Sequence, residues 1–182
     1  MNDWVQKRNV KRRYDVTAEI YDTRYSEEQE TKYNAALTDV KPTGLVLDVG
    51  CGTGLLFDRI ASTAKNVVGV DISKRSLLHA REHAEMAGNV SLVQADADHL
   101  PFKDNEFDIS YAFTMLQNMP KPLNTLLETR RIAKEGAMLV VTGLKKTFSM
   151  ETLKELLQCA GLQVVSVKDD EKLKCYVALT RK

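Results

Sequence analysis

Three glycines at alternate positions follow an apolar run and an acidic residue in the first third of the sequence. Residues 45–55 read LVLDVGCGTGL, which places a short apolar strand and Asp48 directly before the glycines. Glycine has no side chain, so the backbone can turn sharply there and a ligand can lie against it. This run predicts a ligand-binding loop between the carboxyl end of a buried strand and the start of a helix.

The spacing of the glycines narrows the choice of ligand. Dinucleotide-binding folds use the pattern G-x-G-x-x-G, in which the third glycine lets the helix pack close to the strand. Gly50 and Gly52 fit that pattern, but Leu55 stands where the third glycine belongs, and Gly54 precedes it. The sequence therefore disfavours a pyrophosphate site and a nicotinamide oxidoreductase, and it favours an adenosyl ligand without phosphates.

Acidic residues also end the next two apolar runs. Residues 67–71 read VVGVD and residues 90–97 read VSLVQADA, so Asp71 and Asp96 each follow a predicted strand. An acid about 20 residues beyond a glycine loop is placed to hold a ribose diol, because a carboxylate accepts two hydrogen bonds at once. In one parallel sheet these strand-end acids share the edge at which ligands of open α/β sheets bind.

Four segments in this order resemble the class I S-adenosylmethionine-dependent methyltransferases: VLDVGCGTG, GVDIS, QADADHLPF and FDISYAFTMLQNMPKP. The resemblance runs from about residue 44 to the C-terminus. It implies an α/β fold, a doubly wound, Rossmann-like, seven-stranded and mostly parallel sheet with an antiparallel C-terminal hairpin. It also implies an enzyme that transfers a methyl group from S-adenosylmethionine. The alternative is a non-catalytic binding subunit of the same fold that acts through a partner protein.

Periodicity and capping residues place the remaining elements. Helices are expected at residues 55–61, 74–87, 120–134 and 150–160, with Ser73 and Ser149 as N-caps and with Gly88 and Gly161 as stops. The third of these helices should turn Leu123, Leu126 and Leu127 inward. Further strands are expected at residues 107–113, 137–143, 162–167 and 173–179, the last two joined as a hairpin.

The resemblance implies roles for the residues of the glycine loop. Gly50, Gly52 and Gly54 would line the floor beneath the methionine and ribose parts of the cofactor, with Cys51 between them as a small residue and not a nucleophile. Asp48 would help to orient the methionine ammonium, directly or through water. The alternative for Asp48 is an acid that only orients the loop.

The later strand ends would hold the adenosine. Asp71, with Ile72 beside it, would bind the ribose hydroxyls, Asp96 would accept from the adenine amino group, and the Ala97 backbone N–H would reach the adenine ring. For both acids the alternative is a solvated carboxylate at the end of a strand. The residues expected close to the sulfonium are Ala112 and Phe113.

The first forty residues are the most individual part of the sequence. The resemblance implies an N-terminal helical lid, residues 1–40, that packs over the cofactor-binding domain, residues 41–182. Such a lid excludes water from a site and strengthens its electrostatics. Tyr21 is expected to contact cofactor or substrate, as are Tyr14 and Tyr25. The alternative is that these tyrosines dock the helix with their rings.

Five basic residues also lie in this N-terminal segment, at Lys7, Arg8, Lys11, Arg12 and Arg13. They form either a solvated helix face or a set of phosphate contacts to an RNA substrate. No motif decides between the two. The net charge of the whole chain, +1, provides no field that would attract a polyanion.

The methyl acceptor is less defined than the donor. After the fourth strand the sequence reads SYAFTMLQNMP, without the Asn/Asp-Pro-Pro-Tyr motif of enzymes that methylate planar nitrogens. It is closer to methyltransferases of quinone biosynthesis and of tRNA wobble uridines. We expect a small-molecule acceptor, with RNA as the alternative, and assign no catalytic residue. Gln117 and Asn118 are either polar substrate contacts or loop residues that cap the following helix. His99 is either a residue of a surface loop or a general base. The sequence is compatible with a helper subunit and with a homodimer.

The composition bears on domain number and cellular location. A chain of 182 residues with 43% hydrophobic content is long enough for one domain with a real core. Three scattered cysteines do not predict a disulfide framework. The first residues lack an apolar signal core, and no apolar run approaches the roughly 18 residues of a membrane span. We therefore predict a cytoplasmic protein without a membrane partner.

One motif match carries no weight. Residues 79–83 read HAREH, which fits the H-x-x-E-H pattern of zinc peptidases. The stretch falls on a predicted crossover helix, away from the strand ends that carry the glycine loop. No third ligand can be identified, so no metal site is predicted.

Overall fold

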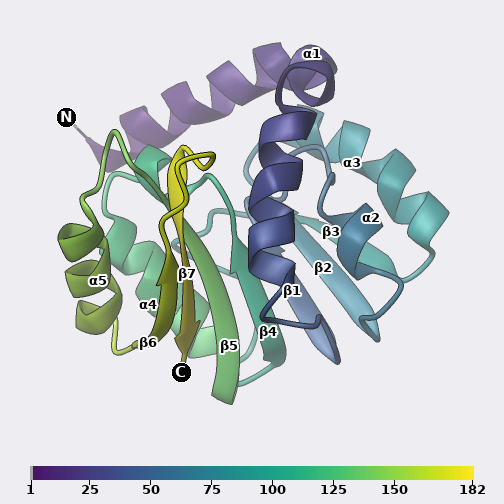
Figure 1. The fold of residues 1–182 in the computed structure, drawn as a ribbon. Helices are drawn as coiled ribbons and strands as arrows, with labels where there is room; N and C mark the ends of the chain where they lie inside the picture. Colours follow the sequence, from purple (N-terminus) through teal and green to yellow (C-terminus); the bar gives the residue numbers. More distant parts are fainter. Residues whose placement is uncertain (1) are drawn as a thin grey trace.

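The computed structural model describes residues 2–182, and a seven-stranded sheet runs through its centre (Figure 1). Met1, the first residue of the predicted lid segment, lies outside the described residues. The strand order is β3-β2-β1-β4-β5-β7-β6. The strands are β1 (Leu45–Val49), β2 (Asn66–Asp71), β3 (Val90–Gln94), β4 (Phe107–Ala112), β5 (Ala133–Leu144), β6 (Gln163–Lys168) and β7 (Cys175–Arg181).

The pairing of the strands confirms the predicted sheet. Strands β1 to β5 pair in parallel, whereas β7 is antiparallel to both β5 and β6. Parallel neighbours need crossover connections, and helices supply most of them. The helical elements are α1 (Asp3–Leu37), α2 (Phe57–Ile60), α3 (Lys74–Ala87), the short 3-10 helix η1 (Leu116–Asn118), α4 (Pro122–Ile132) and α5 (Met150–Cys159).

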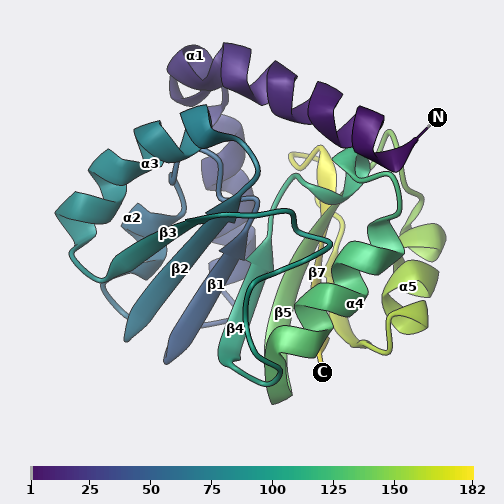
Figure 2. The ribbon, with the colours of Figure 1, turned by 180° about the vertical axis from the view of Figure 1, so that it is seen from behind.

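The sheet divides the core into two layers because side chains alternate along each strand. On β1, Val46 packs with residues of α1, α2 and α3, and the next residue, Leu47, packs with residues of α4 and α5. On β5, Val140 belongs to the first layer, and Leu139 and Val141 belong to the second. The two faces of the sheet are therefore covered by different helices (Figures 1 and 2).

The caps predicted from the sequence are present. The Ser73 and Ser149 side chains accept from backbone N–H groups three residues later, and Gly88 ends α3 in the left-handed conformation. The expectation for Leu127 is wrong, because 45% of this side chain is exposed while Leu126 is buried. Helix α4 has only 11 residues, and its inward stripe is completed by Thr125, Thr129 and Ile132.

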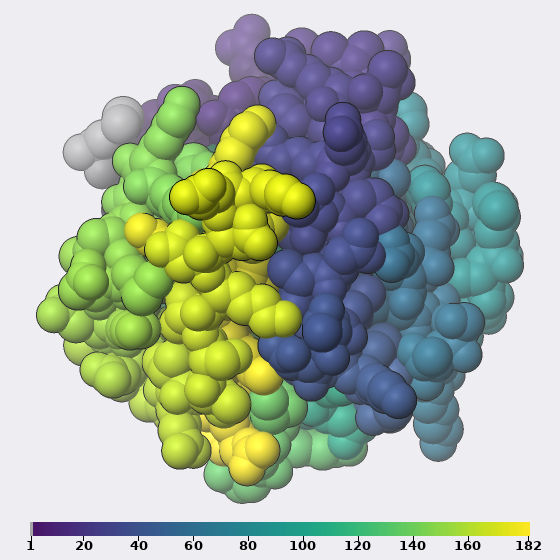
Figure 3. Space-filling view, viewed as in Figure 1, coloured from purple at the N-terminus to yellow at the C-terminus, as the bar shows by residue number. Residues whose placement is uncertain are grey.

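Helix α1 is unlike the other helices. Its first half crosses the top of the molecule, and after a bend its second half runs down beside the sheet (Figures 1 and 2). Half of the six residues that α1 buries are polar: Lys7, Gln29 and Lys32. The second half lies against the C-terminal strands (Figure 3), where the Lys168 ammonium donates to the backbone carbonyl of Ala35 over 2.7 Å. Polar contacts to the rest of the protein, more than an apolar stripe, position this helix.

Candidate functional site

The glycine loop follows β1 and turns back through backbone hydrogen bonds. The N–H groups of Gly50 and Cys51 both donate to the Val70 carbonyl on β2, over 2.7 and 2.9 Å. Gly52 has a φ of +57°, and a Cβ atom built there would meet nothing within 4 Å. The backbone at Gly52 thus borders open space, as a loop that receives a ligand requires.

Gly54 has a different role from its neighbours. Its φ is +90°, and a Cβ atom there would lie 2.9 Å from the Phe57 ring and 3.2 Å from the Ala80 Cα. It is therefore needed for close packing of the loop on α2 and α3. Gly54 and Ala112 line neither of the two cavities described below.

Asp71 is held by the loops on either side of it. Its carboxylate accepts from the Gly52 N–H over 2.9 Å and from the Ser73 N–H over 2.7 Å. Burial raises its pKa, and the two backbone hydrogen bonds oppose that shift. Each carboxylate oxygen has further lone pairs, so Asp71 can still accept hydrogen bonds from a bound diol.

Asp48 is the most buried acid of the site, with 2% of its surface exposed. Burial, together with the charge of Asp71, raises its pKa to about 8. Burial also raises the pKa of the neighbouring Cys51 thiol well above its usual value. Cys51 therefore lacks the thiolate character of a nucleophile. The neutral form of the Asp48 carboxyl is favoured up to about pH 8, and a cation beside it would favour the ionised form.

Asp96 lies in the loop after β3, where it meets the start of α1. The Lys7 ammonium contacts both Asp96 oxygens, over 2.8 and 2.7 Å, and one Asp98 oxygen over 2.5 Å. Burial lowers the Lys7 pKa, but the hydrogen bonds to the two carboxylates outweigh this effect and raise it overall. Only 8% of Lys7 is exposed, so this residue is not part of a solvated basic face.

The first half of α1 is tied to the loops after all four neighbouring strands. Besides the Lys7 contacts, its polar side chains reach the loops that follow β1, β2 and β4. These contacts are Asp22 to the Thr53 hydroxyl at 2.5 Å, Asp15 to the Ser73 hydroxyl at 2.6 Å, and Arg13 to the Asn118 side chain at 2.6 Å. Nothing in the sequence predicts these contacts, because the charged residues of α1 belong to no motif that specifies a partner.

Two adjoining cavities lie between α1 and these loops. The first is bordered by α1 residues and by the ends of β1, β2, β3 and β4, and it brings together the predicted residues Tyr21, Gly50, Gly52, Asp71, Ile72, Asp96, Ala97 and Phe113. The second is smaller and contains the predicted residues Tyr21, Asp48, Gly50, Cys51, Gly52 and Phe113. Tyr14 also lines the first cavity. Tyr25 lines neither and packs on Tyr21, with ring centroids 4.9 Å apart.

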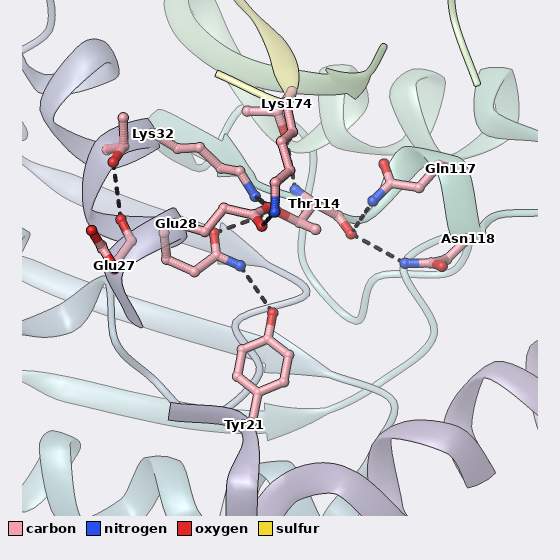
Figure 4. Close-up of polar contacts among 11 residues, drawn as sticks. Tyr21, Glu27, Glu28, Lys32, Thr114, Gln117, Asn118 and Lys174 are labelled. Atoms are coloured by element: carbon pink, nitrogen blue, oxygen red, sulfur yellow. Dashed lines mark hydrogen bonds and ion pairs between the residues drawn. The ribbon is translucent and has the colours of Figure 1, made fainter. Parts of the chain in front are cut away.

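The loop after β4 bends around Thr114, whose φ is +57°. This conformation is unusual for a β-branched residue. The side-chain amides of Gln117 and Asn118 both donate to the Thr114 carbonyl, over 2.7 and 3.1 Å, and hold it in place (Figure 4). The expectation that Gln117 and Asn118 cap the following helix is wrong, because α4 begins after Lys121 without a side-chain cap. Asn118 also donates to the Tyr14 hydroxyl over 3.1 Å.

A polar cluster joins this loop to the second half of α1. Lys32, only 1% exposed, donates to the Thr114 hydroxyl over 3.0 Å and to Glu28 over 2.8 Å. The Thr114 hydroxyl lies 3.4 Å from the Gln29 side-chain oxygen, and the Gln29 amide donates to the Tyr21 hydroxyl over 2.9 Å. Figure 4 shows Tyr21 at one end of this cluster and Lys32 at the other. The sequence offered no signal for Gln29 or Lys32.

The histidines of the H-x-x-E-H match lie elsewhere. A ring nitrogen of His83 lies 3.0 Å from the carboxylate of Asp58, where α3 packs against α2. Within residues 2–182, no three His, Cys, Asp or Glu side chains are grouped as metal ligands. In the same range, no helix combines the length and the apolar character that crossing a membrane requires.

Comparison with known proteins then settles the family. A methyltransferase-domain family matches residues 47–141, more than half of the chain. The chain belongs to the class I S-adenosylmethionine-dependent methyltransferases. S-adenosylmethionine is the cofactor of this methyltransferase domain. The cavity geometry agrees, because the open backbone at Gly52 lies beside the Asp71 carboxylate, and Leu55 occupies the position of the third glycine of a pyrophosphate site.

A curated relative and two solved structures illustrate the similarity. The demethylmenaquinone methyltransferase of Staphylococcus saprophyticus is 37% identical over 105 residues, which are 56% of this chain and 45% of that protein. The chain therefore spans about half the length of this relative.

The Burkholderia thailandensis 1,6-didemethyltoxoflavin-N1-methyltransferase, solved with 1,6-didemethyltoxoflavin and S-adenosylhomocysteine, gives a TM-score of 0.87 at 15% identity, over 100% of this chain and 91% of that one. A methyltransferase solved in complex with the Haloferax volcanii Trm112 methyltransferase activator gives a TM-score of 0.77 at 17% sequence identity. The match covers 92% of this chain and 96% of that one. At these identities the two structures show the shared fold alone.

Proposed function

We propose that the protein binds S-adenosylmethionine in the two cavities under α1 and transfers its methyl group to a small-molecule acceptor. The observation that carries this proposal is the joint placement of the glycine backbone and Asp71. The Gly52 N–H orients the Asp71 carboxylate, and both residues border the same cavity. A ribose held by Asp71 then lies against a backbone that has no side chains to exclude it.

The neighbouring residues extend this binding site in both directions. Toward β3, Asp96 and the Ala97 N–H would hold the adenine. Toward the second cavity, Asp48 would hold the methionine ammonium, because a cation stabilises the ionised form of a buried carboxylate. Phe113 borders both cavities and would lie beside the sulfonium. Cys51 and Ile72 would provide backbone contacts and shape.

The chemistry asks little of the protein beyond alignment. The cofactor supplies a methyl group on a positively charged sulfur, which leaves as a neutral thioether when a nucleophile attacks in line. Holding nucleophile and methyl group in register contributes on the order of 7–11 kcal/mol in ideal cases. A general base is required only for an acceptor that must lose a proton. We therefore assign the work of this chain to positioning and to exclusion of water.

The cavity supports a small acceptor over a macromolecular one. Helix α1 covers the first cavity, and Tyr14, Tyr21, Phe113, Met115 and Met119 line it. Aromatic and thioether side chains suit a flat organic molecule. Two of the relatives described above are named for small-molecule substrates. RNA is the second candidate, but the burial of Lys7 removes one residue from the basic run that favoured it.

Helix α1 would act as the lid, with residues 1–40 as the lid segment and residues 41–182 as the cofactor-binding domain. Its contacts to four separate loops would hold it closed over a bound cofactor, and breaking them would open the site for exchange. A helper subunit remains a proposal that rests on the Haloferax complex with the Trm112 activator. The three cysteines are free thiols, of which two are buried, and this supports a reducing compartment such as the cytoplasm.

Binding of S-adenosylhomocysteine, measured by calorimetry, tests the cofactor site. We expect Asp71→Ala to abolish binding, and we expect Glu171→Ala, which changes an exposed acid in the β6–β7 turn, to leave it unchanged. Transfer of a radiolabelled methyl group into host extract, separated into RNA, protein and small-molecule fractions, then identifies the acceptor class. Wild-type affinity in Asp71→Ala would refute the site.

A further inference from the structure

Hydrogen bonds link Lys32 through Thr114 and Gln29 to Tyr21. Lys32 determines which group donates in each of these hydrogen bonds. A lysine ammonium has three N–H donors and no acceptor. Because the Lys32 ammonium donates to the Thr114 oxygen, the Thr114 hydroxyl proton must point to another partner. The acceptor within reach is the Gln29 side-chain oxygen, 3.4 Å away.

The same logic continues through Gln29 to Tyr21. Since the Gln29 oxygen faces Thr114, its NH₂ group faces the Tyr21 hydroxyl and donates to it over 2.9 Å. The Tyr21 oxygen thus accepts from Gln29, and the Tyr21 O–H proton remains available for a different acceptor. Burial raises the Tyr21 pKa, so the phenol keeps this proton at all physiological pH values.

Tyr21 stands where the two cavities meet. Both cavities are lined by Tyr21 and by Phe113, the residue expected beside the sulfonium. Gln29, which lies behind the Tyr21 hydroxyl, lines only the second cavity, and Thr114 lines only the first. Tyr21 is therefore at the wall of the region in which methyl transfer is proposed to occur.

We propose that Tyr21 donates a hydrogen bond to a ligand oxygen that carries no proton of its own, and that Lys32 and Thr114 are positioning residues that fix this direction. The oxygen belongs to a carboxylate, a carbonyl or an ionised hydroxyl group. It comes either from the methyl acceptor or from the methionine carboxylate of the cofactor. This inference rests on the proposed function, because it places both ligands in the cavities under α1.

The charges around Lys32 support this reading over a purely structural one. Glu28 is shared between Lys32 and the more exposed Lys174, at 2.8 and 2.7 Å, so the three residues carry one net positive charge. A helix-to-loop contact would need no buried lysine, since an apolar side chain of similar length packs without the desolvation cost. The surplus positive charge favours an electron-rich oxygen at the far end of the chain.

The experiment combines Tyr21→Phe, Lys32→Met and Thr114→Val, singly and as double variants with Tyr21→Phe. Dissociation constants are measured for S-adenosylhomocysteine and for its analogue without the carboxylate. Methyl transfer is measured with the extract fraction that accepts the label. We expect Tyr21→Phe to lose about tenfold in one of these quantities, as for a hydrogen bond to an anionic oxygen. Thr114→Ser, which keeps the hydroxyl, should behave as wild type.

The key result is the absence of additivity. Lys32→Met and Thr114→Val should each reproduce the loss seen in Tyr21→Phe and should add nothing in the Tyr21→Phe background. Lys172→Met, which changes an exposed lysine of the β6–β7 turn outside this cluster, is the matched control and should leave every quantity unchanged. Because Thr114→Val is isosteric, it serves as the second variant if Lys32→Met is unstable.

The pattern of losses identifies the source of the oxygen. A loss with S-adenosylhomocysteine but not with its decarboxylated analogue assigns the oxygen to the cofactor. An unchanged affinity with a lower kcat/KM assigns it to the acceptor. The proposal is overturned by wild-type behaviour of Tyr21→Phe, by equal losses with both cofactor analogues, or by additive effects. Failure of the wild-type protein to bind S-adenosylhomocysteine would instead refute the proposed function.

Discussion

The glycine loop and helix α1 face each other across the same cavities, but they are held in place by different forces. The loop is fixed by its own backbone, through two bonds to the Val70 carbonyl and one to Asp71. Helix α1 is fixed by charged and polar side chains, among them Lys7 and Lys32, that reach loops far away in the sequence. The glycine loop, one wall of the cavities, is thus held by the backbone of the sheet, whereas helix α1, the other wall, is held by side-chain contacts.

This difference has a physical consequence. Backbone hydrogen bonds at a strand end persist as long as the sheet is folded, so the loop opens only with the domain. Contacts between charged side chains are separately breakable and respond to salt, pH and ligands. Under the proposed function, a cofactor would displace the contacts of α1 without unfolding the site that binds it.

The largest expected effect concerns Asp48, the acid buried beside the glycine loop. The Asp48 pKa is about 8 in the folded protein and 3.8 for an unperturbed aspartate, so the folded state binds one more proton between these pH values. The free energy of unfolding should then fall as pH rises through that window, by up to roughly 6 kcal/mol. Denaturant unfolding at several pH values should show this slope, and Asp48→Asn should remove it.

Cofactor binding sharpens the same test. A methionine ammonium next to Asp48 favours the ionised carboxylate, so S-adenosylhomocysteine binding below pH 8 should release a proton. Calorimetry in buffers of different ionisation enthalpy measures this release. If Asp48→Asn releases as many protons as the wild type, Asp48 does not hold the ammonium.

The second effect separates two glycines of the loop. Gly54→Ala should cost about 3 kcal/mol of stability, because the new Cβ atom meets Phe57 and Ala80 at a strained φ. Gly52→Ala should cost only about 1 kcal/mol of strain, since its Cβ atom meets no protein atom. Thermal unfolding and S-adenosylhomocysteine affinity distinguish the two.

For Gly52→Ala the expected loss is in affinity, as the methyl group fills the space left for the ligand. Equal stability losses in both variants, with equal affinities, would contradict the separate roles assigned to these glycines.

The third effect concerns helix α1. Lys7→Met leaves Asp96 and Asp98 without their shared cation, and we expect a loss of about 1–3 kcal/mol. Limited proteolysis should cut the first half of α1 faster, while the sheet keeps its protection. Arg12→Met, which changes an exposed residue of the same helix, is the control and should stay within about 0.5 kcal/mol. Unchanged proteolysis of Lys7→Met would show that α1 does not depend on this contact.

The smallest effect is expected outside both regions. His83→Ala removes the partner of Asp58 between α3 and α2, where a partly exposed ion pair contributes at most about 1 kcal/mol. Cofactor affinity should not change, and Zn²⁺ should not raise the melting temperature of the wild-type protein. A zinc-dependent increase that His83→Ala abolishes would revive the discarded H-x-x-E-H motif.

Much of the fold could be predicted because its signals are local. Alternating apolar strands, the Ser73 cap and the glycine stop at Gly88 depend on neighbouring residues only, and the structure contains them. Leu127 was misplaced because helical spacing gives a stripe but not its width, and polar Thr125 and Thr129 fill the inward positions instead.

The sequence by itself determined the sheet, its helices and the strand-end residues that could face an adenosyl ligand, because backbone periodicity and glycine spacing act over short distances. Only the tertiary structure decided what covers them. The pairings of Lys7 with Asp96 and of Lys32 with Thr114 join residues 89 and 82 positions apart. Charged side chains choose partners by proximity in space, and no local pattern in a sequence encodes that proximity.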